Sequence, residues 1–167
     1  MRIQFEDMAD SWGRSSLSYA AQYGHEAVAK FLVARADFEV DSKDKAGRSQ
    51  LFYAAVNGHE AVVKILVVQG DVEVNTKDED DRSPLLYAAQ YGNGAVVKIF
   101  VPWNDVEVNT NDDHGGSPLS YGALNGHEAV VVKILVAQDD IVNPKDRHGR
   151  SPLLYGAGTQ CCRNVAA

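Results

Sequence analysis

The residues best suited to acid–base chemistry lie between positions 80 and 148. They are two histidines, two aspartates and a tyrosine: His114, His148, Asp80, Asp113 and Tyr121. A histidine changes its charge near neutral pH, and a neighbouring carboxylate or phenol can exchange a proton with it. Brought together, these residues would form a site able to isomerise or cyclise a small molecule. Histidine and aspartate are also frequent in surface turns, so we expect turn residues here and keep the catalytic site as the alternative.

Three further histidines, His25, His59 and His127, occur in equivalent Gly-His-Glu sequences. Residues that recur once per structural layer lie roughly 10 Å apart, which is too far for one metal ion. We therefore expect these histidines to brace loops. The acidic run 78–81 lacks the glycine and glutamate spacing of an EF-hand, and the sequence contains no phosphate-binding or zinc-protease motif. The sequence therefore predicts no metal and no cofactor.

A repeat with a period of 34 residues determines where these side chains lie. A leucine with a tyrosine two positions later occurs five times, as Leu17, Leu51, Leu85, Leu119 and Leu153 with Tyr19, Tyr53, Tyr87, Tyr121 and Tyr155. A fixed period of this size indicates stacked units that bury their apolar faces only against their neighbours. We predict one array over residues 1–167, with about four full repeats starting near 13, 47, 81 and 115 and a partial C-terminal repeat starting near 149.

Each repeat predicts two helices and an arm. In the third copy, Ser83 is a good N-cap and Pro84 suits the first helical position. The second helix carries apolar residues at i, i+3 and i+4, as in Val28, Phe31 and Leu32 of the first repeat, which predicts a buried stripe. Alternating residues and a turn follow, which predict a short extended arm or β-hairpin.

The fourth repeat departs from this regular length. It has one extra residue between Gly126 and Lys133, and its arm is one residue shorter between Asp140 and Asn143, so the period is kept. An inserted residue within a helix is typically accommodated by a π-type bulge. We expect such a bulge, or a loosened helix start, at this point.

Three sub-motifs resemble the ankyrin repeat: Ser-Pro-Leu-x-Tyr-Ala-Ala, Gly-His-Glu-Ala-Val-Val-Lys and Asp-Val-Glu-Val-Asn. They recur in order over nearly the whole chain, and their residues resemble those of fungal ankyrin-repeat proteins most closely. The resemblance implies an all-α solenoid, in which helix-turn-helix pairs are joined by short β-hairpin-like arms. Two departures are a serine in place of the family's threonine and the absence of the motif histidine after the leucine.

The resemblance also implies that the concave face, built from the first helices and the arm tips, binds a protein partner. The recurring tyrosines would lie on that face, where they either form an aromatic ladder for the partner or pack against the arms. A Tyr/His-lined concave pocket for a small molecule is the alternative. The residues expected on the binding surface are Trp12, Tyr19, Gln22, Tyr23, Tyr53, Asn57, Glu79, Asp80, Tyr87, Gln90, Tyr91, His114, Tyr121, Leu124, Asn125 and His148.

Charge and cysteine content narrow the class of partner. The net charge is −7, which argues against nucleic acid because phosphate binding needs concentrated lysine and arginine. The two cysteines, Cys161 and Cys162, are adjacent and form no disulfide framework, so we expect an intracellular protein, cytoplasmic or nuclear. No apolar stretch is long enough for a membrane. Uncapped array ends, or the concave face, would allow self-association.

Overall fold

The computed structural model describes residues 9–35, 38–69, 72–103 and 105–127, with Val131, Leu135, Gly149 and Ser151. These described residues form seven α-helices and no strand: α1 Ser16–Tyr23, α2 Glu26–Val33, α3 Gln50–Val56, α4 Glu60–Val67, α5 Pro84–Gln90, α6 Gly94–Phe100 and α7 Pro118–Leu124. The all-α prediction is therefore confirmed. None of the seven has the length and apolar character that crossing a membrane requires.

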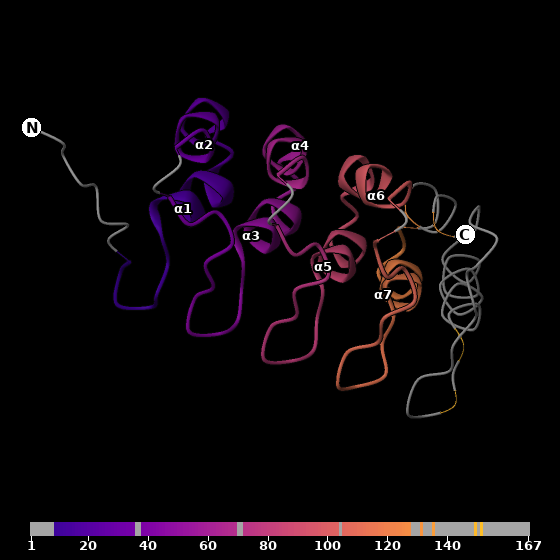
Figure 1. Cartoon of the computed structure of the whole chain (residues 1–167). Coiled ribbons are helices and arrows are strands. Elements are labelled where there is room, and N and C mark those ends of the chain that lie inside the picture. Colours follow the sequence, from indigo (N-terminus) through magenta and orange to yellow (C-terminus); the bar gives the residue numbers. More distant parts are fainter. Residues whose placement is uncertain are drawn as a thin grey trace, which may run out of the picture.

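The helices lie in two parallel rows, from which the arms project on one side (Figure 1). The inner row contains α1, α3, α5 and α7, and each of these packs on the next. The outer row contains α2, α4 and α6, which also pack in succession. Each inner helix of the first three repeats contacts the outer helix that follows it. This arrangement is a helical solenoid, in which contacts run between neighbouring repeats.

Serines begin the inner helices. The side chains of Ser15, Ser49, Ser83 and Ser117 each accept a hydrogen bond from the backbone N–H three residues later, which satisfies one of the free donors at a helix start. Proline occupies the first helical position of α5 and α7. The predicted cap and proline positions are therefore confirmed.

The core is a stripe of small and branched side chains between successive repeats. The inner helices contribute the repeat leucines and paired alanines, while α4 and α6 contribute valines such as Val62 and Val96. The equivalent stripe of α2 is not buried as predicted, because Val28 is 46% and Phe31 64% exposed. Among the described residues, α2 packs on an outer helix on one side only, since α4 is its sole contacting neighbour in that row.

The arms are held by turns more than by strand pairing. Within the described residues, the one isolated β-bridge joins Lys43 to Ser49, so a full β-hairpin is not formed. Each turn contains one residue with positive φ, which is glycine in three described arms and Asp81 in the third repeat. Successive arm tips are joined by main-chain hydrogen bonds, from Lys45 N to Trp12 O (2.9 Å), Glu79 N to Ala46 O (3.1 Å) and Asp113 N to Asp80 O (3.2 Å).

The irregular fourth repeat is described at two points of its second helix. Val131 lies in a π-helical turn and Leu135 is helical, and both are fully buried. Val131 N donates to His127 O at 2.9 Å. The π-helical backbone at Val131 agrees with the bulge expected from the inserted residue. The shortened arm at 140–143 lies outside the described residues.

Candidate functional site

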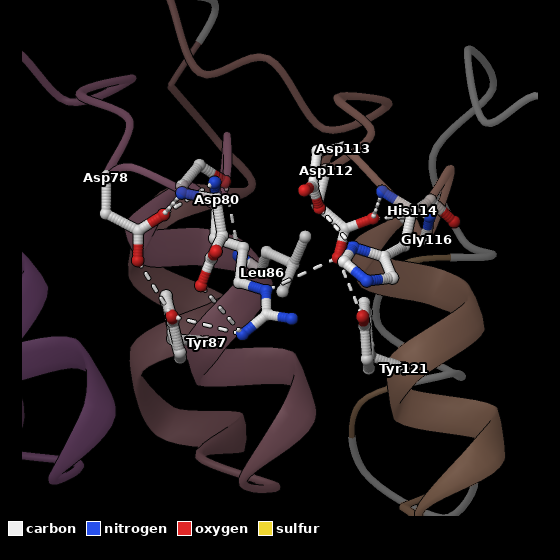
Figure 2. Close-up of polar contacts among 12 residues, drawn as sticks. Asp78, Asp80, Leu86, Tyr87, Asp112, Asp113, His114, Gly116 and Tyr121 are labelled. Atoms are coloured by element: carbon white, nitrogen blue, oxygen red, sulfur yellow. Dashed lines mark hydrogen bonds and ion pairs between the residues drawn. The ribbon is translucent and has the colours of Figure 1, made fainter.

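The repeat tyrosines are bound to aspartates of the arms. In each described repeat the tyrosine hydroxyl donates to the aspartate nine residues earlier: Tyr19 to Asp10 (2.7 Å), Tyr53 to Asp44 (2.5 Å), Tyr87 to Asp78 (2.8 Å) and Tyr121 to Asp112 (2.7 Å). Figure 2 shows the third and fourth of these bonds. The other carboxylate oxygen accepts two backbone N–H groups of the turn, as Asp44 does from Ala46 and Arg48. Each pair therefore fixes an arm to its inner helix.

These bonds change the proton affinity of both partners. Burial, followed by the hydrogen bond to the aspartate, raises the pKa of Tyr53 and of Tyr121 to about 12. Partial burial would raise the pKa of Asp112, but hydrogen bonds from Tyr121, the Gly116 N–H and Arg82 outweigh it and lower that pKa. The tyrosines are thus held neutral and Asp112 ionised near neutral pH.

An arginine four residues after the aspartate supports the pair differently in each repeat. Arg14 binds its own Asp10, with Nε 2.9 Å from Oδ2, and it also donates to the Tyr19 hydroxyl. Arg82 reaches Asp112 of the next repeat, with Nε 3.3 Å from Oδ2. The fourth repeat has Gly116 at this position. Arg48 has no carboxylate within ion-pair distance among the described residues, and its buried Nε lacks a hydrogen-bond partner there.

Two of the three loop histidines, His59 and His127, brace a neighbouring repeat, in agreement with the predicted role, whereas the ring of His25 lies 6.1 Å from that of Tyr23. His59 Nε2 lies 3.0 Å from Gln22 O, and His127 Nε2 lies 3.1 Å from Gln90 O. The third repeat has Asn93 in the histidine position, and its Nδ2 donates to the carbonyls of Ala55 and Val56. These groups satisfy backbone carbonyls at the ends of the preceding inner helices.

The exposed part of the predicted surface lies at the ends of the inner helices and at the arm tips. Trp12, Tyr23 and Tyr91 are 63%, 60% and 56% exposed. The other exposed predicted residues are Asn57, Glu79, Asp80, His114, Leu124 and Asn125, while Tyr19, Gln22, Gln90 and Tyr121 are half-buried and Tyr53 and Tyr87 are buried. His148 lies outside the described residues. Of the two roles expected for the repeat tyrosines, packing against the arms therefore describes Tyr53 and Tyr87 better than exposure to a partner.

The comparison with known families accounts for this architecture. A family model described as three copies of ankyrin repeats matches residues 3–78 and 85–166. The chain belongs to the ankyrin-repeat family. No curated protein matches its sequence. Ankyrin repeats are in general protein–protein interaction modules, whereas the resemblance to fungal members stays a prediction.

The acid–base residues of this ankyrin array are only partly brought together. His114 Nδ1 contacts Asp113 Oδ1, and Asp113 N donates to Asp80 O. The Tyr121 hydroxyl is bound to Asp112 instead. Two cavities lie elsewhere, one of about 540 Å³ between α2 and α4 and one of about 450 Å³ at the first two arm tips, and none of these acid–base residues lines either.

The hydrogen bonds that Asp112 accepts argue against a metal site at the fourth arm. Ligand atoms of Asp112, Asp113 and His114 lie within 4.8 Å of one another. Both oxygens of Asp112 already accept hydrogen bonds, from the backbone N–H groups of His114 and Gly116 and from Tyr121 and Arg82. A cation there would have to displace these donors.

The aspartates of the arms were not among the residues predicted to be important. A signal for them exists, because Asp10, Asp44, Asp78, Asp112 and Asp146 recur with the 34-residue period. Aspartate in a turn that bonds the backbone two residues later is a common arrangement. The period and the turn together would therefore have indicated a structural role.

Proposed function

We propose that this ankyrin array is a non-catalytic interaction module, and that its protein partner binds the ends of the inner helices and the arm tips. The observation that carries the proposal is the regular exposure of large side chains along the inner row. Tyr23 and Tyr91 project at equivalent positions of the repeat, the first as the last residue of α1 and the second directly after α5, and Leu124 is exposed at the end of α7. Tyrosine is enriched at protein interfaces because it combines apolar area with a polar group.

The exposed tyrosines are already ordered without a partner. The ring of Tyr23 stacks on Tyr19 with centroids 6.4 Å apart, and the ring of Tyr91 stacks on Tyr87 at 6.5 Å. Since Tyr19 and Tyr87 are tied to aspartates, the outer rings rest on a fixed layer. A side chain held in place before binding loses less entropy in the complex.

Two asparagines alternate with these tyrosines along the surface. Asn57 and Asn125 are exposed, and each Nδ2 donates to the carbonyl of the repeat tyrosine four residues earlier at 2.9 Å. Their amide oxygens are available for a partner's N–H groups. An alternation of aromatic and amide groups suits a polypeptide, which offers both apolar side chains and backbone donors.

The test compares three forms of the whole chain as bait in extracts of the source cells. Tyr23→Ala combined with Tyr91→Ala should lose the specific partner, as measured by quantitative mass spectrometry. The control is Phe31→Ala, which removes an equally exposed aromatic residue from the outer helix α2. Partners retained by the double variant, or lost equally with Phe31→Ala, would place the binding surface elsewhere.

We further propose an intracellular location for this module. The support is the cysteine content, since the only two cysteines are adjacent and suit a reducing compartment. Fractionation of cells that express the tagged chain tests this. Recovery of the chain in the medium would contradict it.

A further inference from the structure

A cavity of about 450 Å³ lies between the tips of the first two arms. Trp12 and Arg14 line it from the first arm, Lys45 and Arg48 line it from the second, and Tyr53 of α3 also contributes. We call this cavity the tip pocket. Arg14 packs against the aromatic wall of the pocket. Its guanidinium carbon lies 4.8 Å from the centroid of the Trp12 indole and 4.6 Å from the centroid of the Tyr19 ring. The pocket thus combines an aromatic wall with several cationic groups.

Two cations of the tip pocket are not neutralised within the described part of the chain. Arg14 is paired with Asp10, but Lys45 and Arg48 have no carboxylate partner there. Asp44, which also lines the pocket, already accepts bonds from Tyr53 and from the N–H groups of Ala46 and Arg48. The buried Nε of Arg48 lacks an acceptor. That Nε is enclosed by the chain, and the guanidinium carbon lies 5.2 Å from the centroid of the Phe52 ring, so an anionic group in the pocket would have to bind the terminal nitrogens of Arg48.

The equivalent positions in the third and fourth repeats have the opposite charge, whereas those of the fifth repeat, 145–150, again contain three cationic residues and one acidic residue. Residues 43–48 contain three cationic and one acidic residue, whereas 77–82 contain two cationic and four acidic residues and 111–116 contain two acidic and no lysine or arginine. Glu79 and Asp81 are exposed in the third arm. An acidic group would therefore be repelled by the third and fourth tips and attracted by the second.

We propose that the tip pocket receives an aspartate or glutamate side chain from an acidic segment of the protein partner. Arg48 and Lys45 bind the carboxylate, and the indole of Trp12 covers the aliphatic stem. Carboxylate bound to guanidinium is a strong, directional charge-assisted hydrogen bond. This inference rests on the proposed function, and it adds the chemistry of the partner's segment that binds at the tip pocket.

The first experiment selects ligands for the whole chain from a random peptide library displayed on phage. Selected peptides should carry clustered aspartate or glutamate. The same selection on the Lys45→Glu, Arg48→Glu variant should lose that acidic preference. Lys98→Glu is the matched control, because it reverses a charge at an exposed position of the outer helix α6, and it should leave the preference unchanged.

The second experiment uses Trp12 as a reporter of the tip pocket. The chain has two tryptophans, so Trp103→Phe leaves Trp12 as the sole source of indole fluorescence. A selected acidic peptide should shift this fluorescence, and its glutamine-substituted version should not. Lys45→Gln combined with Arg48→Gln should lower the affinity for the acidic peptide by at least about tenfold. The melting curve of this variant checks that the chain stays folded.

The outcomes separate this inference from the proposed function. The selection could yield peptides that contain no acidic residues and whose binding depends on Tyr23 and Tyr91. That result would overturn the tip-pocket assignment and leave the proposed function standing. An acidic preference that survives the Lys45 and Arg48 substitutions would also overturn it. If the library yields no peptide, and the Tyr23, Tyr91 double variant also keeps every partner in extracts, both the tip-pocket assignment and the proposed function are overturned.

Discussion

The guanidinium of Arg82 lies 3.3 Å from the carboxylate of Asp112, which belongs to the next repeat. In the first repeat the equivalent Arg14 binds the aspartate of its own arm. Position 116, where the fourth repeat would carry its own arginine, is glycine, and a Cβ there would collide with the Tyr121 ring. Arg82 thus supplies to Asp112 the cation that Gly116 does not, and joins the third repeat to the fourth.

Arg82 is expected to matter more for stability than the equivalent Arg48. Arg82→Gln should lower the free energy of unfolding by about 1–3 kcal/mol, because it removes a charged hydrogen bond to the buried Asp112. Arg48→Gln should lower it by less, about 0.5–1 kcal/mol, because Arg48 has no carboxylate partner in the described chain and loses only its contact with the Phe52 ring, at 5.2 Å. Urea unfolding of the two variants measures the difference. Equal losses would show that the bond to Asp112 contributes nothing.

Stability should fall at alkaline pH through the repeat tyrosines. The pKa of Tyr53 and of Tyr121 is raised from 10.0 to about 12 in the folded chain, by burial and by the bond to the aspartate. The folded state therefore binds these protons more tightly than the unfolded state, so the contribution is complete below pH 10 and is lost as pH rises through 12. Phenolate absorbance and urea unfolding, both measured across this range, check the prediction.

The matching variant is Tyr53→Phe combined with Tyr121→Phe. It should lose about 1–2 kcal/mol per site at neutral pH, because each aspartate loses a hydrogen-bond donor. Its stability should then vary less with alkaline pH than that of the unaltered chain. A double variant with the same alkaline slope would mean that other groups cause the loss.

Asp81→Gly should stabilise the chain. Asp81 has φ of 61°, and it is the one non-glycine residue of the described chain with positive φ. A left-handed backbone costs most residues about 1–2 kcal/mol, aspartate less because its short side chain bonds locally, and glycine almost nothing. Because glycine also loses more conformational entropy on folding, thermal unfolding should show a gain of less than about 1 kcal/mol. Asp80→Gly removes the same charge from a position without positive φ, together with the ion pair to Arg82 at 3.5 Å, and it should give no gain.

Gly92→Ala should be more destabilising than Gly126→Ala. Both glycines have positive φ, at 72° and 75°. A Cβ at Gly92 would lie 2.6 Å from Nδ1 of His127, whereas at Gly126 it meets no atom of the described residues within 4 Å. The strain of the backbone is common to both, so the difference, about 1–3 kcal/mol for overpacking, reports the His127 contact. Similar losses at both sites would show that the imidazole moves away freely.

Local signals were sufficient to predict the helices and their ends. The serine N-caps and the prolines act within three or four residues, so Ser83 and Pro84 could be assigned from the sequence alone. The bracing role of His59 and His127 followed from their period, since one residue per layer cannot gather at one site. These features depend on the repeat and not on the details of packing.

The exposure and the charge partners of residues that face a neighbouring repeat were not predicted. Val28 and Val62 occupy equivalent positions, yet the first is largely exposed and the second buried, because their outer helices have different neighbours. Arg48 and Arg82 are likewise equivalent in sequence, and only the contacts across the arms distinguish them. The repeat fixes what a residue is near within its own unit, whereas a charge partner in the next unit, such as Asp112 for Arg82, depends on how the units pack.

The main-chain hydrogen bonds between successive arm tips have a consequence for how such a chain evolves. Because the links from Lys45 to Trp12 and from Glu79 to Ala46 use backbone atoms, the tip side chains can be replaced without breaking them. Mutation at a tip can therefore change the surface that the array presents while selection for folding stays satisfied. Duplication or loss of one 34-residue unit carries its tip residues with it, so a lineage can lengthen or reorder this surface one repeat at a time.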